Sequence, residues 1–172
     1  MITLLTIGRL KDKSMAALDQ EYRKRISAFS KIEVCEVKDE ANLHTEREAE
    51  VRIAMEKEAE RALARIRPDD FVILLDLHGQ EWTSEDFAAR LGSWQRTRRS
   101  LVFVIAGSLG PAPALTARAD VRWKLSSLTF THLMTRILVL EQIYRGFMII
   151  NHRTYHKRTA CRLLVSPGTA GF

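Results

Sequence analysis

The sequence predicts an α/β fold in which a mostly parallel sheet is flanked by helices. Segments with strand character alternate with segments of helical periodicity, which is the order expected of a layered α/β domain. Residues 71–75 and Leu101–Ile105 are uninterrupted apolar runs, typical of strands that are buried on both faces. Residues 133–150 form a helical pattern whose apolar stripe is broad enough to indicate burial on more than one side, for example against a partner subunit.

Five strands are predicted from short apolar runs bounded by glycine, proline or charged residues. They are Ile2–Ile7, Ile32–Val37, residues 71–75, Leu101–Ile105 and residues 121–125. Five helices are predicted from apolar residues spaced three and four apart. They are residues 11–27, a helix from Thr45 that Pro68 ends, a helix capped by Ser84 that runs to about Trp94, a short helix from Pro113 to Ala119, and residues 133–150. Residues 77–80 are expected to form a turn, and Glu48 is expected to complete a capping box with Thr45.

Composition and charge narrow the class of protein. The chain has 172 residues, of which 46% are hydrophobic, so one domain with a real core is expected. We expect no signal peptide and no membrane span, and the two cysteines, Cys35 and Cys161, suit a reducing cytoplasm. The net charge is +6, and residues 121–172 hold eight Lys or Arg against one acid, Glu141. This asymmetry favours RNA or DNA as a partner.

Three predicted loops follow the carboxyl ends of strands, where ligands bind in open parallel sheets. They are residues 75–79, 106–110 and 125–132. Gly107 and Gly110 allow a backbone to approach a ligand closely, and small hydroxyl residues alternate with apolar ones in the third loop. Neither the glycine-rich dinucleotide fingerprint nor the P-loop pattern is present. None of the five histidines has metal-ligand spacing, so no metal is expected.

The C-terminal third carries a specific resemblance. The run from Leu125 to His132, followed by Arg136, residues 141–145 and the pair Tyr155 and His156, resembles the RlmH-type methyltransferases of the SPOUT superfamily. Residues 6–11, 22–25 and 75–80 are similar to the same family, so the resemblance covers the chain to about Arg158. Two positions depart from it: Ala106 replaces the first of two glycines, and Thr131 replaces a proline.

The resemblance implies methylation of N3 of a pseudouridine in helix 69 of 23S ribosomal RNA, with S-adenosylmethionine as the methyl donor. It further implies a C-terminal trefoil knot, a homodimer, a single domain over residues 1–158, and a C-terminal extension over residues 159–172. Transferred by position, the cofactor contacts are Leu75, Gly107, Ser126, Ser127, Leu128, Thr129, Phe130 and Thr131. Two alternatives stay open: a SPOUT enzyme that acts on transfer RNA, and a non-catalytic RNA-binding protein with this fold.

A ring nitrogen that carries a proton at neutral pH needs a base, or a group that stabilises the anion, before it can be methylated. The candidates for this role are His156, Tyr155 and His132. Cationic side chains among polar aromatic ones can hold phosphates while bases stack. The candidates for RNA contact are Arg136, Arg145, Arg153, Lys157 and Arg158, of which the first two can instead brace a dimer. Glu141, within an apolar helix, is expected to be a buried partner of an arginine.

Overall fold

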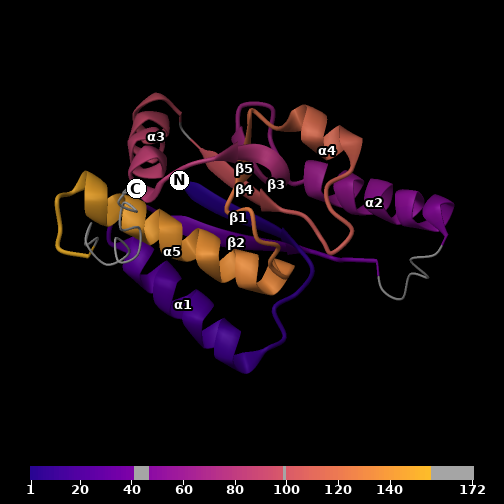
Figure 1. Cartoon of the computed structure of the whole chain (residues 1–172), viewed down its shortest axis with the longest axis horizontal. Coiled ribbons are helices and arrows are strands. Elements are labelled where there is room, and N and C mark those ends of the chain that lie inside the picture. The colour runs from indigo at the N-terminus through magenta and orange to yellow at the C-terminus, as the bar shows by residue number, and fades with distance from the viewer. Residues whose placement is uncertain (41–46, 99, 156–172) are drawn as a thin grey trace, which may run out of the picture.

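The computed structural model describes residues 1–40, 47–98 and 100–155, and its centre is a five-stranded, wholly parallel sheet (Figure 1). The strand order is β2-β1-β4-β3-β5. The strands are β1 (Ile2–Ile7), β2 (Ile32–Val37), β3 (Phe71–Glu81), β4 (Leu101–Ile105) and β5 (Val121–Lys124). The predicted mostly parallel α/β fold is therefore confirmed, whereas the C-terminal trefoil knot stays a prediction.

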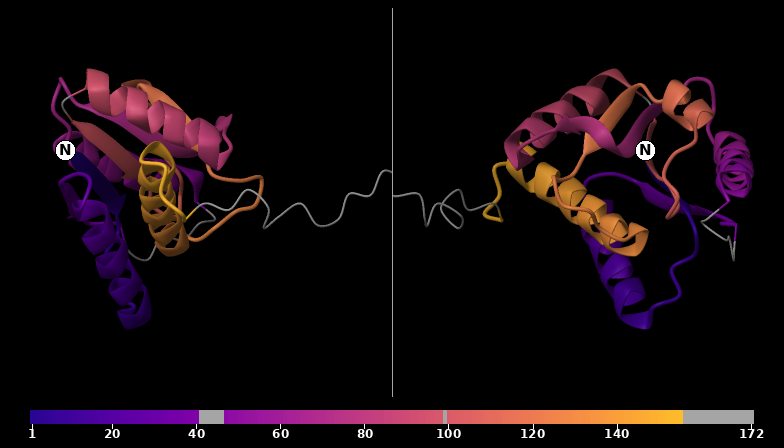
Figure 2. Two further views of the ribbon diagram at one scale, coloured as in Figure 1. Left: turned by 90° about the vertical axis from the view of Figure 1, so that its left-hand side faces the viewer. Right: turned by 45° about the vertical axis from the view of Figure 1, so that its right-hand side comes forward.

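Helices cover both faces of the sheet. They are α1 (Lys13–Ser27), α2 (Glu48–Leu63), α3 (Ser84–Thr97), α4 (Pro113–Arg118) and α5 (His132–Ile150). Helices α1, α3 and α5 bury their apolar residues in one core, and α2 and α4 bury theirs in the other. Figure 2 shows α2 on the side of the sheet away from α5. Within the described ranges, no helix is long and apolar enough to cross a membrane.

The strands form both cores because alternate side chains point to opposite faces. In β4, Leu101, Phe103 and Ile105 belong to the core under α1, α3 and α5, while Val102 and Val104 belong to the core under α2 and α4. All five side chains are buried. The uninterrupted apolar run is thus explained by two packed faces, as the sequence predicts.

Strand β3 is longer than the sequence predicts. Residues 77–80 do not form a turn, because β3 continues to Glu81 and pairs again with β5 after a shift in register between Leu75 and Gln80. The close approach of the two strands explains why Gly79 is a glycine. A Cβ atom there would lie 2.6 Å from the carbonyl of Arg122. Within this irregular part of β3, Asp76, Leu77 and His78 line the cleft described below.

Two predicted helix caps are wrong. The N-cap of α3 is Thr83 and not Ser84, because the Thr83 hydroxyl accepts from the backbone N–H of Asp86 at 3.1 Å while the Asp86 carboxylate contacts Thr83. Helix α2 begins at Glu48 after Arg47, which makes no side-chain cap. Glu48 is therefore the first helical residue and not the third, and Thr45 lies outside the described residues.

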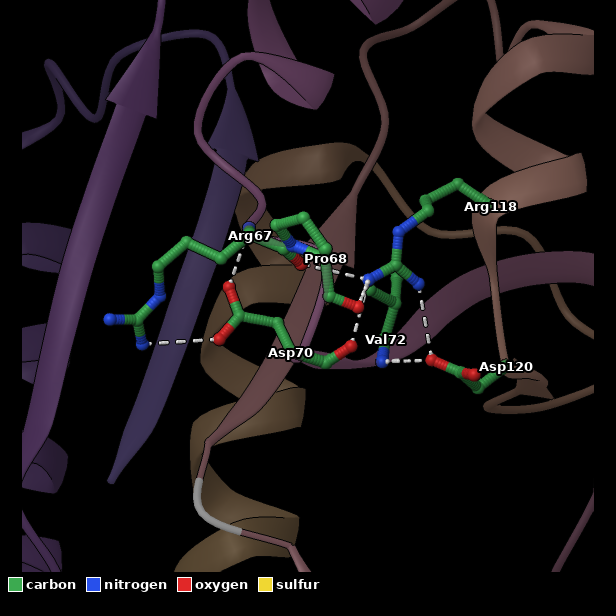
Figure 3. A network of polar contacts seen from close by, with 6 residues as sticks. All are labelled: Arg67, Pro68, Asp70, Val72, Arg118 and Asp120. Carbon is green, nitrogen blue, oxygen red and sulfur yellow. Dashed lines mark hydrogen bonds and ion pairs between the residues drawn. The ribbon is translucent and has the colours of Figure 1, made fainter.

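A polar network fixes α4 at the amino-terminal edge of the sheet (Figure 3). Arg118 donates to the carbonyl oxygens of Arg67 and Asp70 at 3.0 and 2.8 Å, and to Asp120 at 3.3 Å. Asp120 also accepts from the backbone N–H of Val72 at 2.8 Å. Because α4 lies between β4 and β5 in the chain, this network ties the start of β5 to the start of β3.

Candidate functional site

The carboxyl ends of β3, β4 and β5 meet in a cleft of about 1030 Å³. This volume suits a small-molecule ligand or cofactor. Its walls come from three loops and from the start of α5. The lining includes Leu75, Asp76, Leu77, His78, Ile105, Ala106, Gly107, Ser108, Gly110, Arg122, Trp123, Ser126, Leu128, Thr129, Phe130, Thr131 and His132. The three loops that the sequence predicts after the carboxyl ends of strands therefore line one cleft.

The wall from β3 is ordered by a buried aspartate that sequence reasoning did not single out. Asp76 Oδ2 accepts from Arg122 Nε at 2.7 Å, and its Oδ1 accepts from the backbone N–H of His78 at 2.9 Å. Burial by itself would raise the pKa of Asp76, but these two hydrogen bonds outweigh it and the pKa lies below its ordinary value. An acid directly after a buried strand was the available signal.

The wall from β4 is a glycine turn. Gly110 has φ +84°, a left-handed conformation that favours glycine, and its N–H donates to the carbonyl of Gly107 at 3.1 Å. Gly107 lines the cleft on one side, and on the other it faces Glu58 of α2. A Cβ atom at Gly107 would lie 2.9 Å from Glu58 Oε2. A side chain at position 107 is therefore disfavoured by Glu58 behind the cleft wall.

The third wall runs from β5 to α5 and leads into a capped helix. Ser126 Oγ accepts from the backbone N–H of Leu128 at 3.0 Å, and Thr131 Oγ1 accepts from that of Met134 at 3.3 Å. Thr131 is thus the N-cap of α5. Of the predicted cofactor contacts, Ser127 alone is absent from the cleft lining, because its hydroxyl pairs with Lys124 and Glu81 at 3.2 Å each.

The two candidate proton-handling residues that the structure describes, His132 and Tyr155, lie at opposite ends of α5. His132 lines the cleft, and its Nε2 lies 3.4 Å from the Cβ position of Gly8. Tyr155 follows the opposite end of α5, where its hydroxyl donates to Glu141 at 3.2 Å. Burial raises the pKa of Tyr155, and its contacts with Tyr22 and Glu141 raise it further, so it keeps its proton at neutral pH. His156 lies outside the described residues.

The predicted RNA contact of Arg136 is wrong for this arrangement. Its side chain is 6% exposed and is held by Asp19 at 2.7 Å and by Glu36 at 2.6 Å, so no phosphate can reach it. Arg145 pairs with Glu141 at 2.5 Å, which confirms the expected partner of that acid. Charge composition cannot distinguish such internal pairs from a binding surface.

The remaining basic candidates lie at the C-terminal end of the described chain. Arg153 is exposed, and its guanidinium lies 5.1 Å from the centre of the Phe29 ring. Lys157 and Arg158 lie outside the described residues, as does the predicted extension 159–172. Over residues 1–40, 47–98 and 100–155, no group of three or more His, Cys, Asp or Glu side chains is placed to hold a metal ion.

Comparison with known proteins identifies the family. A family model described as "Predicted SPOUT methyltransferase" matches residues 1–156. A curated protein of Ruminiclostridium cellulolyticum named ribosomal RNA large subunit methyltransferase H is 42% identical over 160 residues, which cover 91% of this chain and 99% of that protein. A protein of the same name from Desulforamulus reducens is 41% identical over 160 residues, covering 91% and 98%.

The comparison with solved structures gives a match to a Legionella pneumophila protein described as a "putative methyltransferase" in complex with S-adenosylmethionine. Its TM-score is 0.46 at 8% identity, and the match covers 83% of this chain and 64% of that one. The family model and the curated relatives carry the assignment by themselves, because they extend over nearly all of the sequence. The chain belongs to the SPOUT methyltransferase family and is a methyltransferase.

Proposed function

We propose that this enzyme transfers a methyl group from S-adenosylmethionine to N3 of a pseudouridine in helix 69 of 23S ribosomal RNA. One observation carries the proposal: a chain about 40% identical to proteins named ribosomal RNA large subunit methyltransferase H forms a cleft of about 1030 Å³ that is lined by the loop before α5, where its resemblance to the RlmH type is most specific. The pseudouridine and its N3 position are proposed as the target because the chain resembles the RlmH type.

The residues of the cleft fit the methyl donor. Gly107 lines the cleft with its backbone, and the buried oxygen Glu58 Oε2 behind it has no hydrogen-bond partner among the described residues. We propose that Leu75, Gly107 and the stretch 126–131 hold the cofactor, with Ser127 supporting the stretch from outside the cleft. When bound, the cofactor supplies a methyl group on a positively charged sulfur, which is an electrophile.

The chain itself must orient the base and take up its proton. Of the two described candidates for proton handling, His132 lines the cleft and Tyr155 does not, so we assign His132 the acceptance of the N3 proton at a ring nitrogen. Holding the two reacting groups in line supplies a further large part of the rate enhancement, because it replaces a bimolecular encounter. The Thr131 cap and the Arg136 ion pairs fix His132 at the first turn of α5.

We propose that a second copy of the chain completes the site. Leu77 and Leu128, at the cleft, are 58% and 69% exposed, and Phe130 and Met134 are exposed beside them. Apolar side chains gathered in this way are typical of interfaces. Helix α5 spans about 27 Å at the usual rise per residue, so Tyr155 cannot reach the cleft of its own chain in this arrangement. An antiparallel pairing of two α5 helices would bring it to the cleft of the partner.

The RNA substrate is supported by charge. The net charge of +6 favours association with a polyanion at low ionic strength. Exposed Arg153 is the described candidate for a phosphate contact, and Lys157 and Arg158 stay predictions.

Mass mapping of the modified nucleosides of ribosomal RNA, from cells with and without the gene, tests the proposed function. We expect the methyl group on the helix 69 pseudouridine to disappear with the gene and to return with a wild-type copy. An unchanged helix 69 with a missing methyl group in transfer RNA would favour the alternative of a SPOUT enzyme that acts on transfer RNA. No missing methyl group in either RNA would favour a non-catalytic RNA-binding protein.

A further inference from the structure

Glu58 is an unusual residue on the buried face of α2. The other residues of that face are alanines, Ala54, Ala59 and Ala62, which let the helix lie close to the sheet. Glu58 is 3% exposed. Its Oε1 accepts from the backbone N–H of Glu40 at 2.9 Å, but its Oε2 has no partner among the described residues. A buried carboxylate oxygen without a partner destabilises a fold, so a functional reason for it is worth seeking.

The unpartnered oxygen lies directly behind the cleft. The Cβ position of Gly107 is 2.9 Å from Glu58 Oε2 and 3.2 Å from Ile7 Cγ2. Gly107 lines the cleft and Glu58 does not, so the backbone of one glycine separates the carboxylate from whatever occupies the cleft. A larger residue at position 107 would push the carboxylate away.

The surroundings of Glu58 favour the arrival of a positive charge. Burial raises the pKa of Glu58, the Glu40 N–H lowers it, and the nearby carboxylates of Asp39 and Glu40 raise it. Arg61 is the cation that acts on this group, but it already pairs with Glu40 and donates to the Lys38 carbonyl at 3.0 Å. Ile7 of β1 and Gly107, in the loop after β4, lie beside Glu58 here. His132 approaches the Cβ position of Gly8 at 3.4 Å, and Asp39 approaches the same position at 3.9 Å.

We propose that Glu58 is the counter-charge for the cationic half of S-adenosylmethionine, acting from behind Gly107. This inference rests on the proposed function, which supplies the cofactor. The methyl donor carries two positive groups, the sulfonium and the amino-acid ammonium, while the demethylated product keeps only the ammonium. Opposite charges attract strongly where the intervening medium is protein and not water. If the sulfonium is the partner, methyl transfer removes the attraction and the product is released more easily.

Titration calorimetry on the full chain tests this with three probes: S-adenosylmethionine, S-adenosylhomocysteine, and 5′-methylthioadenosine, which lacks both positive groups. Glu58→Gln is the variant. Glu56→Gln is its matched control, because Glu56 lies on the same helix with a side chain that is 62% exposed. We expect Glu58→Gln to weaken the binding of S-adenosylmethionine about tenfold, which corresponds to 1.4 kcal/mol of binding free energy. The control should bind all three probes as the wild type does.

Each pattern of binding gives a definite answer. A loss of affinity for S-adenosylmethionine alone identifies the sulfonium as the partner of Glu58. A loss of affinity for both S-adenosylmethionine and S-adenosylhomocysteine, with the affinity for 5′-methylthioadenosine unchanged, identifies the ammonium. Equal loss for all three probes, or no loss, overturns the inference and leaves Glu58 a structural residue. If the wild type binds no S-adenosylmethionine, the proposed function itself fails. If Glu58→Gln does not fold, Glu58→Ala, which copies Ala54 and Ala62, replaces it.

Proton linkage gives a second readout that a structural role would not produce. A cation that arrives beside Glu58 favours its ionised form, so binding should release a proton wherever the free protein is protonated there. The affinity of the wild type and of Glu56→Gln for S-adenosylmethionine should therefore rise with pH through the pKa of Glu58 and then level off. Glu58→Gln should lose this rise. The same rise in Glu58→Gln would contradict the inference.

Discussion

Arg136 on α5 donates through Nε to Asp19 on α1 at 2.7 Å, although 117 positions separate the two residues in the chain. Its Nη1 donates to Glu36 of β2 at 2.6 Å, and Glu36 accepts from the backbone N–H of Leu10 at 3.3 Å. The start of α5 is thereby tied to α1, β2 and the loop after β1. Because His132 lies one turn before Arg136, these bonds also fix the position of His132 in the cleft.

The buried position of Arg136 predicts a large cost of removal. Arg136→Ala breaks a buried ion pair with Asp19, which is 2% exposed and keeps its second pair with Arg23 at 2.8 Å, and we expect a loss of about 3–5 kcal/mol in the free energy of unfolding. Urea titration measures this loss. Arg153→Ala serves as the control because Arg153 is exposed, and it should change stability by less than about 0.5 kcal/mol. Similar losses for the two variants would contradict the assignment of Arg136 to the interior.

Thr131, where the resemblance to the RlmH type predicts a proline, caps α5 with its hydroxyl. Thr131→Val removes the cap while keeping the shape, so we expect a loss of about 1 kcal/mol in stability and weaker binding of S-adenosylmethionine. Thr131→Ser keeps a capping hydroxyl and should behave as the wild type does. Thermal unfolding and calorimetry compare the two variants. Equal behaviour of Val and Ser would show that the hydroxyl does not order this wall.

Asp76 predicts a dependence of stability on pH. Its pKa in the folded protein lies below its ordinary value, so its contribution to stability is present above the unfolded pKa and is lost as pH falls through the folded pKa. Asp76→Asn should lower the free energy of unfolding by about 1–3 kcal/mol at neutral pH. The difference from the wild type should shrink below about pH 4. A difference that stays constant from neutral to acidic pH would exclude this ionic contribution.

Gly107 and Glu58 should be coupled in a double-mutant cycle. Gly107→Ala places a methyl group 2.9 Å from Glu58 Oε2 and 3.2 Å from Ile7, so it should lower stability. Glu58→Ala removes the first of these clashes. We expect the second substitution to reduce the cost of the first by about 0.5–3 kcal/mol, as for residues in contact. Urea titration of the four proteins measures the coupling, and additive costs would show that the two residues do not share this space.

The parallel sheet and the three cleft loops could be predicted because uninterrupted apolar runs indicate strands buried on both faces, and loops at their carboxyl ends share one edge. The bulge in β3 could not, because it depends on a close contact between Gly79 and Arg122 of another strand. Arg136 was misassigned because charge patterns do not reveal partners 117 or 100 residues away. The burial of Glu58 could not be predicted, because the sequence does not distinguish a buried acid from the many solvent-exposed charged residues of α2.

Methylation in vitro tests the central claim most directly. Purified protein is incubated with S-adenosylmethionine carrying an isotopically labelled methyl group and with large ribosomal subunits or ribosomes from cells that lack the gene. We expect the label on N3 of the helix 69 pseudouridine, read by mass spectrometry of RNA fragments. His132→Gln should lower the rate by about 100-fold or more while binding of S-adenosylmethionine is unchanged. Label on transfer RNA, or no label on helix 69, would contradict the account.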